Sequence, residues 1–355
     1  MNRRRFLQTS VGIATVASAG CLSSLGFETT TARAAPPLLE DRPDAVYVPT
    51  HVEGMAMAGM ADAGPYRCAL TYSYPHRFWL VTGRETQLVE IDGEDSLHLM
   101  VSCWDAETGV VPPNGSVSMT IDRNGETVVE KPPWPMLSQN MGVHFGDNVA
   151  LPGEGAFDVS VELGPLQTRR TGAFADRFEA SASAEFTLEF DRADLEELSY
   201  MRLDDRAGER GAVDPMQMEM MQIAQLPTAA DLPGRAIGEA TSGDGRFLVR
   251  ALEMPPEGVD GEGPYLAVSA RTPYNRYPLP FMSLSATVER GGKTGFDGAL
   301  TPTLDPDLDY HYGAAVGRLE SGDVITLDPG APPQVARHEG YETAFLELSE
   351  MTLTA

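Results

Sequence analysis

The sequence predicts an all-β protein made of two antiparallel β-sandwich domains, and three observations support this. Apolar and polar residues alternate over about five to eight positions in most of the chain, as in strands with one buried face. Gly, Pro, Asn and Asp separate these stretches, and Asn124-Gly125 and Gly291-Gly292 are typical of hairpin turns. The two halves of the chain also resemble each other, which indicates that one β-domain occurs twice.

The internal repeat has a fixed offset of 167 residues. Residues 97–149 align with 264–316 without a gap, and 15 of the 53 pairs are identical. We therefore expect one sandwich over residues 40–195 and a second over 234–355, with the same strand order. Residues 196–233 are predicted to form a short helical, methionine-rich linker. A helix is expected to begin at Arg192, and a second to follow Pro215.

The linker contains four closely spaced methionines, for which three interpretations stay open. They can form an apolar face docked between the two sandwiches, a patch that collects copper, or a surface that binds a partner protein. The residues are Met216, Met218, Met220 and Met221.

Residues 1–39 are interpreted as an export signal and tether. The arginines at positions 3–5, followed by an apolar run over 11–19, resemble a twin-arginine signal. The run is too short to span a bilayer. Cys21 ends a lipobox-like sequence and is the predicted lipidation site, with cleavage after Ala34 as the alternative. We therefore expect a lipid-anchored protein on the outer face of the cell membrane.

Charge excludes nucleic acid as a partner. The 355 residues include 52 Asp and Glu but only 26 Lys and Arg, which gives a formal net charge of −26. A field this negative repels phosphates. The acid excess, with Lys131 and Lys293 as the only lysines, is typical of a halophilic protein. The sequence has no phosphate-binding loop, nucleophile elbow or His-Glu-x-x-His motif, so no enzymatic activity is predicted.

Two further cysteines, Cys68 and Cys103, lie in strand-like surroundings in the first half of the chain. An exported protein permits a disulfide between them, and two buried free thiols are the alternative.

Histidine and methionine side chains of the first domain predict a metal site. His98 and Met100 are two residues apart in a predicted strand, so they project from the same face. Met136, Met141 and His144 follow within one short segment. Imidazole nitrogen combined with thioether sulfur suits copper, especially Cu(I). Because histidine must be neutral to bind, affinity is expected to weaken below about pH 6.

These motifs resemble those of the exported copper-binding proteins associated with iron transport, which are often lipoproteins with an immunoglobulin-like sandwich. The matching segments are His98-Leu99-Met100, Trp134-Pro135-Met136 and His144-Phe145-Gly146-Asp147-Asn148. The resemblance implies that His98, Met136 and His144 are copper ligands, with iron nearby. Met100 stands where the family has glutamate, and Met141 is an alternative to Met136. The family's later histidine has no counterpart near 168–178, so His76 and His51 are candidates to replace it.

The second copy lacks most of this ligand set. At the 167-residue offset, His98 becomes Tyr265, Met100 becomes Ala267, Met136 becomes Thr303 and Met141 becomes Leu308, while His144 keeps a partner in His311. This pattern indicates a metal-binding domain followed by a degenerate copy. In the alternative interpretation neither copy binds metal, and the two retained histidines share a structural hydrogen bond at a β-turn.

The functional prediction is an exported, lipid-anchored copper-binding protein that supports iron transport across the membrane, with an iron permease as its implied partner. The competing class is a surface protein with immunoglobulin-like domains that binds other proteins and holds no metal.

Overall fold

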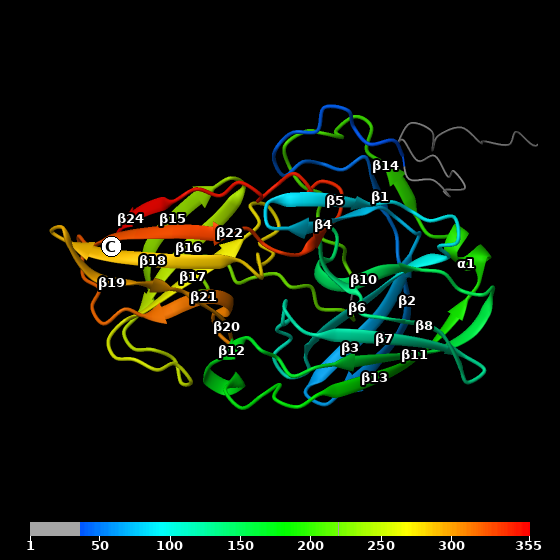
Figure 1. Cartoon of the computed structure of the whole chain (residues 1–355), viewed down its shortest axis with the longest axis horizontal. Helices are drawn as coiled ribbons and strands as arrows, with labels where there is room; N and C mark the ends of the chain where they lie inside the picture. Colours follow the sequence, from blue (N-terminus) through cyan, green and yellow to red (C-terminus); the bar gives the residue numbers. More distant parts are fainter. Residues whose placement is uncertain (1–35, 219) are drawn as a thin grey trace, which may run out of the picture.

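The computed structural model describes residues 36–218 and 220–355, and these residues are almost entirely β-strands (Figure 1). Their one α-helix, α1 (Arg192–Glu196), begins where the sequence predicts a helix. The Asp191 carboxylate caps it by accepting a hydrogen bond of 2.8 Å from the Ala193 N–H. A single 3-10 turn, η2, covers Gly172–Phe174. Across these described residues, no helix has the length and apolar character needed to cross a membrane.

The first domain consists of two antiparallel sheets and a small accessory pair. The larger sheet contains, in spatial order, β2 (Ala56–Ala63), β3 (Tyr66–Ser73), β6 (Leu97–Asp105), β10 (Gly142–Val149), β9 (Trp134–Ser138), β23 (Ala336–Arg337), β4 (Phe78–Thr82) and β5 (Glu85–Val89). The opposing sheet contains β13 (Ala182–Phe190), β11 (Gly155–Leu163), β7 (Val117–Arg123) and β8 (Glu126–Lys131). The accessory pair is β1 (His51–Glu53) and β14 (Tyr200–Arg202).

The second domain repeats this arrangement. One sheet contains β12 (Arg169–Arg170), β20 (Thr301–Asp305), β21 (Asp309–Ala315), β17 (Tyr265–Arg271), β16 (Gly245–Leu252) and β15 (Arg235–Ser242). The other contains β19 (Lys293–Ala299), β18 (Ser283–Arg290), β22 (Val324–Ala331) and β24 (Met351–Thr354). The order β2-β3-β6-β10-β9 in the first domain therefore corresponds to β15-β16-β17-β21-β20 in the second.

Strand register follows the 167-residue offset. His144 lies opposite Met136 in the first domain, and His311 lies opposite Thr303 in the second. Both histidines therefore occupy equivalent positions, but these positions are inside strands β10 and β21. Their expected placement at a β-turn is wrong, because a ladder partner on each side extends these segments.

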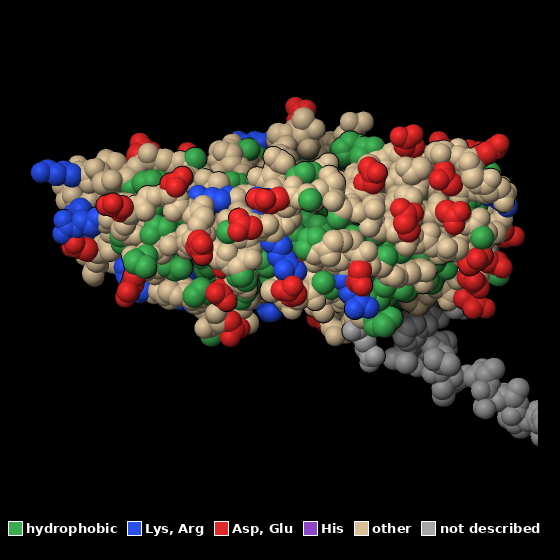
Figure 2. All heavy atoms as spheres, turned by 90° about the horizontal axis from the view of Figure 1, so that it is seen from below, with side chains coloured by type: hydrophobic (Ala, Val, Ile, Leu, Met, Phe, Trp, Pro, Cys, Tyr) green, Lys and Arg blue, Asp and Glu red, His purple; other side chains and the backbone are tan. Residues whose placement is uncertain are grey.

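Alternating side chains form the core of each sandwich. In β11, Phe157, Val159, Val161 and Leu163 are buried, whereas Asp158 and Glu162 are exposed. Acidic side chains are scattered over the face of the molecule in Figure 2 and outnumber the basic ones there, as the net charge requires. Cys68 and Cys103 lie directly opposite each other in β3 and β6, with Cα atoms 4.1 Å apart, and form a disulfide.

The predicted second helix of the linker is wrong. Residues 212–218 and 220–227 form no helix, because their backbone groups bond to other parts of the chain. The Met216 N–H donates to the Asn140 carbonyl at 2.8 Å, and the Leu226 N–H donates to the Arg276 carbonyl at 2.9 Å. These contacts replace the bonds within the segment that a helix needs. Met221 is buried and Met218 packs against the core, whereas Met220 is exposed.

Each domain also lends one short strand to the other. β12 follows β11 of the first domain along the chain and pairs in parallel with β20 of the second. β23 follows β22 of the second domain and pairs in parallel with β9 of the first. In Figure 1, β12 lies beside β20 at the border between the domains. These exchanged strands position residues of one domain inside the sheet of the other.

Candidate metal centre

The centre is built on one face of strands β6 and β10. His98 on β6 lies opposite Asn148 on β10, and Met100 lies opposite Gly146. His144 is two residues before Gly146 and so projects from the same face of the pleat. A Cβ atom on Gly146 would be 2.7 Å from His98 Nε2, so the His98 ring lies over β10 only because this position has no side chain.

The exchanged strand β23 brings a third histidine to this face. The backbone N–H of His338 donates to the Leu137 carbonyl at 3.1 Å, which fixes the residue beside β9. His338 Nε2 is 3.3 Å from the Met136 sulfur, and its ring centroid is 5.3 Å from that of His144. The second half of the chain therefore contributes directly to a site in the first.

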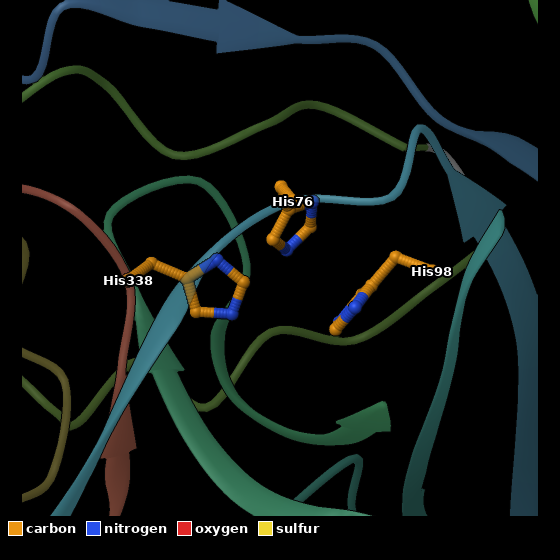
Figure 3. Close-up of side chains that lie close together, drawn as sticks. All are labelled: His76, His98 and His338. Atoms are coloured by element: carbon orange, nitrogen blue, oxygen red, sulfur yellow. The ribbon is translucent and has the colours of Figure 1, made fainter. Parts of the chain in front are cut away.

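His76 completes the cluster from the segment that leads into β4. Its ring centroid is 3.9 Å from that of His98 and 4.7 Å from that of His338. One ring nitrogen from each of these three histidines lies within 4.8 Å of the others. Figure 3 shows the three rings, from separate segments of the chain, around a common space.

Hydrogen bonds to Nδ1 determine which nitrogen each imidazole presents. Nδ1–H donates to Asn148 Oδ1 at 2.8 Å in His98, to the Gly142 carbonyl at 3.1 Å in His144, and to Glu53 Oε2 at 3.1 Å in His76. The Asn148 amide group donates to the His76 carbonyl, which leaves its oxygen free to accept. In each ring that is neutral, the second nitrogen, Nε2, therefore carries the lone pair.

These three Nε2 atoms are buried and have no hydrogen-bond partner. An unsatisfied buried acceptor is costly, and three in one cluster require an explanation. A metal ion would give such nitrogens a partner, since a neutral imidazole Nε2 is a common metal ligand. The residues present therefore fit a metal ion.

Burial keeps the imidazoles in their metal-binding form. It lowers the pKa of His98 and His338 well below the usual range, and that of His144 to about 4. Burial would raise the pKa of Glu53, but hydrogen bonds from His51 and His76 hold it at about 2. At neutral pH, His98, His144 and His338 are therefore neutral, and the Glu53 carboxylate is charged.

The predicted ligands fall into two groups. His98, Met136 and His144 belong to the cluster, together with His76. Met100 and Met141 are buried and line an adjoining cavity of about 90 Å³.

His51, the other candidate, does not belong to the cluster but is linked to it through Glu53. Its Nε2 is 3.1 Å from Glu53 Oε1, so Glu53 lies between it and His76. Cys21, the predicted lipidation site, lies outside the described residues.

Sequence reasoning missed His338, although a signal for it exists. The resemblance placed a further histidine near residues 168–178, and the same segment of the second copy is 335–345. His338 lies in that interval, at the position equivalent to Thr171. The first copy has no histidine in this segment, and the exchanged strand supplies one from the second copy.

In the second domain, the equivalent face has a histidine whose two ring nitrogens both form hydrogen bonds. His311 Nδ1 bonds to the Asp309 carbonyl at 3.0 Å, as His144 does to Gly142, so the expected shared structural hydrogen bond exists. His311 Nε2, however, is 2.9 Å from the Tyr265 hydroxyl. Tyr265 replaces His98, and its hydroxyl satisfies the nitrogen that stays unpartnered in His144.

Fold and site together define a two-domain β-sandwich protein with a buried histidine–methionine cluster where the exchanged strand β23 joins the first domain. A family described as a domain of unknown function (DUF7350) matches residues 230–354. No curated protein is significantly similar to the chain.

Two solved structures of FetP from uropathogenic Escherichia coli are similar to part of the chain. The first, a copper-bound variant, is 17% identical over 39% of this chain and 92% of its own, with a TM-score of 0.31. The second, FetP as isolated, is 14% identical over 39% of this chain and 95% of its own, with a TM-score of 0.27. At these identities and TM-scores the similarity does not assign a function, so the function of this chain is inferred from its own residues.

Proposed function

We propose that this chain is an extracytoplasmic copper-binding protein. The observation that carries the proposal is the set of three buried Nε2 atoms, on His76, His98 and His144, that have no partner in the protein. His338 and Met136 add a fourth imidazole and a thioether beside them. Structural histidines in a core normally have both nitrogens satisfied, as His311 does.

The donor set favours copper over other metals. Several imidazoles suit copper, zinc and iron alike, but a thioether selects the soft ion Cu(I). Magnesium and calcium prefer oxygen ligands, and Glu53 already bonds to two histidines. We expect His98, Met136, His144 and His338 to hold the ion, with His76 next to them. Bound copper would supply one-electron chemistry through its Cu(I) and Cu(II) states.

The cellular role rests on the resemblance of the sequence motifs. It implies that the protein supports iron transport, passing metal or electrons to an iron permease, and that Cys21 anchors it to the outer face of the membrane by a lipid. The protein itself is not proposed to be an enzyme. Met100 stands in place of the family's glutamate, so an adjacent iron ion would have to use Glu53 or Glu339, the two carboxylates that line the adjoining cavity.

Copper titration of the purified protein lacking residues 1–34 tests the proposal. We expect one tightly bound Cu(I) per chain in a salt whose anion does not bind Cu(I). His98→Ala, His144→Ala and His338→Ala should each weaken binding by at least about 100-fold, since each removes one ligand. Met136→Ala should weaken Cu(I) binding more than Cu(II) binding, because thioether sulfur prefers the softer ion.

The degenerate copy offers a matched control. His311→Ala removes a histidine at the equivalent strand position and should leave copper affinity unchanged. Sub-stoichiometric binding by the wild type, or full binding by His144→Ala, would reject the copper proposal. The interaction protein without metal would then be the better explanation of the fold.

A further inference from the structure

The two exchanged strands are equivalent to each other in register. Arg169 on β12 lies opposite Thr303, and Ala336 on β23 lies opposite Met136, so the 167-residue offset extends to these strands. The next backbone contacts also match. The Thr171 N–H donates to the Leu304 carbonyl at 3.0 Å, as the His338 N–H does to the Leu137 carbonyl at 3.1 Å. Arg169 therefore takes, in the second domain, the position that Ala336 takes in the first.

The Arg169 side chain reaches across the degenerate copy of the metal face. Its Nε donates to Thr303 Oγ1 at 2.9 Å, and its Nη2 donates to the Tyr265 hydroxyl at 2.9 Å and to the Gly313 carbonyl at 2.7 Å. These three partners are the counterparts of Met136, His98 and Gly146. The guanidinium thus contacts the same strand positions that surround the orphaned nitrogens of the first domain.

The hydroxyl and imidazole groups next to this guanidinium form a continuous chain of hydrogen bonds. The Tyr265 hydroxyl accepts from Arg169 and donates to His311 Nε2 at 2.9 Å, while His311 Nδ1–H is bonded to the Asp309 carbonyl. Burial lowers the pKa of His311 to about 4, so the imidazole is a neutral acceptor at pH 7. In the first domain, Ala336 has no long side chain, and the corresponding nitrogens have no partner.

We infer that the Arg169 guanidinium occupies, in the second domain, the position that the metal ion takes in the first, and that it replaces this ion as a permanent cation joining the two domains. This inference rests on the proposed function for the identity of the ion. The second site is closed to metal because a covalently attached cation fills it. The chain therefore binds one ion, although it carries two copies of the domain.

The replacement has a structural consequence for how the domains are joined. β12 is fixed to the second domain at all times, because Arg169 bonds to β17, β20 and β21. β23 is paired with β9 and β4 of the first domain, and an ion held by His338 adds a further contact there only when it is bound. Copper occupancy therefore strengthens the attachment of β23 to the first domain and leaves that of β12 to the second unchanged.

Restoring the ligands of the second site tests the inference. A variant with Arg169→Ala, Thr171→His, Tyr265→His and Thr303→Met recreates the set found at Ala336, His338, His98 and Met136, and retains His311. We expect it to bind two Cu(I) ions per chain, against one for the wild type. The matched control carries the three ligand substitutions but keeps Arg169, and it should stay at one ion.

Two results would overturn the inference. One is a second copper ion in the control that keeps Arg169, since the guanidinium would then not occupy the site. The other is a single copper ion in the fourfold variant when circular dichroism shows that it is folded. If the wild type binds no copper at all, the proposed function fails, and the cation site of the second domain is then judged by a separate measurement.

That measurement is chemical rescue of the single variant Arg169→Ala. The substitution leaves a cation-sized space lined by oxygen acceptors, so added guanidinium ion at millimolar concentration should raise its melting temperature and leave the wild type unaffected. Methylammonium, which lacks the planar set of donors, is the control and should rescue less. Equal responses of variant and wild type would show that no cation site exists there.

Discussion

Single hydrogen bonds decide what each histidine of the centre can do. Asn148, the Gly142 carbonyl and Glu53 each accept a hydrogen bond from the Nδ1–H of one ring. The other ring nitrogen, Nε2, is therefore the atom available to bind a metal ion. In metal sites such partners orient the ligand and increase its basicity. The second domain has Ala315 at the position of Asn148, and this orienting amide is missing from the copy that we assign as closed to metal.

Gly146 is predicted to be required for copper binding. In Gly146→Ala, the new Cβ would be 2.7 Å from His98 Nε2 and 3.2 Å from Met100 Cγ, so the His98 ring must move away from β10. We expect copper affinity to fall by about 10–100-fold. Gly115→Ala is the control, because its Cβ would meet Phe145 at an ordinary 3.7 Å. Equal affinities of both variants would contradict the placement of the ion at His98 Nε2.

Buried neutral histidines also predict the pH dependence of stability. Histidine titrates near pH 6.5 in an unfolded chain, whereas the pKa of both His144 and His311 is lowered to about 4 by burial. The unfolded chain therefore binds more protons between these values. The free energy of unfolding of the metal-free protein should be highest above pH 6.5 and fall towards pH 4, by up to about 1.4 kcal/mol per pH unit for each histidine.

Urea unfolding at a series of pH values checks this expectation. A free energy of unfolding that stays constant from pH 7 to pH 4 would contradict the assigned burial of these rings.

The low pKa values also change the expected pH dependence of copper binding. The sequence predicts that binding weakens below about pH 6. Protons compete with copper only when they bind the free imidazole, so the loss of binding is expected closer to pH 4.

At the scale of elements, the centre depends on short segments held by contacts outside their own sequence. β23 has two residues, yet it positions His338 beside Met136. The adjacent Arg337 is fully buried and donates to the carbonyls of Pro333, Tyr341 and Ala344. Burial lowers the pKa of Arg337 to about 9, so it remains charged at neutral pH.

Arg337→Met is predicted to destabilise the protein and to weaken copper binding together. The substitution keeps most of the side-chain volume but leaves buried carbonyls without donors, which should lower the free energy of unfolding by on the order of 3 kcal/mol. His338 should lose its fixed position as the segment loosens. Arg318→Met removes an exposed guanidinium and should change stability by less than about 0.5 kcal/mol. Urea unfolding and copper titration of both variants decide the matter.

The disulfide between β3 and β6 is predicted to support stability without contributing to metal binding. Its cysteines are 35 residues apart, so removing the cross-link by Cys68→Ala with Cys103→Ala should cost about 3 kcal/mol. Copper stoichiometry should stay at one per chain, since backbone pairing still holds β6 next to β10. A folded double variant that no longer binds copper would show that the cross-link positions His98.

At the scale of the whole molecule, duplication and strand exchange give the two domains equivalent sheet faces. We assign a metal ion to the face in the first domain and the Arg169 guanidinium to the face in the second. Both faces keep a histidine at the same register, and both receive a strand from the other domain. One receives His338 and the other Arg169. The asymmetry of function therefore arises from a few side chains on a common backbone arrangement.

Membrane attachment is a prediction for the molecule as a whole. Cys21→Ser should release the protein from the membrane into the medium, because the acyl chains of a lipoprotein provide the anchor. Arg3→Lys combined with Arg4→Lys should keep it inside the cell, since the paired arginines are the predicted export signal. Fractionation of cells with an antibody to the protein measures both. Membrane association that persists in Cys21→Ser would reject Cys21 as the anchor, whereas release of the wild type as well would favour cleavage after Ala34.

The sequence by itself was sufficient for the all-β class, the duplication and part of the centre. Strand periodicity is local, and a repeat at a fixed offset is visible in the residues themselves. For the same reason His98, Met136 and His144 could be proposed together, since short motifs carry them.

The tertiary structure alone decided the remainder. His338 reaches the site through pairing between β23 and β9, strands about 200 residues apart, and no local pattern encodes such a contact. The linker lost its predicted helix to backbone bonds with Asn140 and Arg276, which are likewise distant in sequence. The Arg169 guanidinium meets Tyr265 and Thr303 only because β12 joins the other domain's sheet. Side-chain periodicity reports which face of a strand is buried, whereas long-range backbone pairing determines which strands meet.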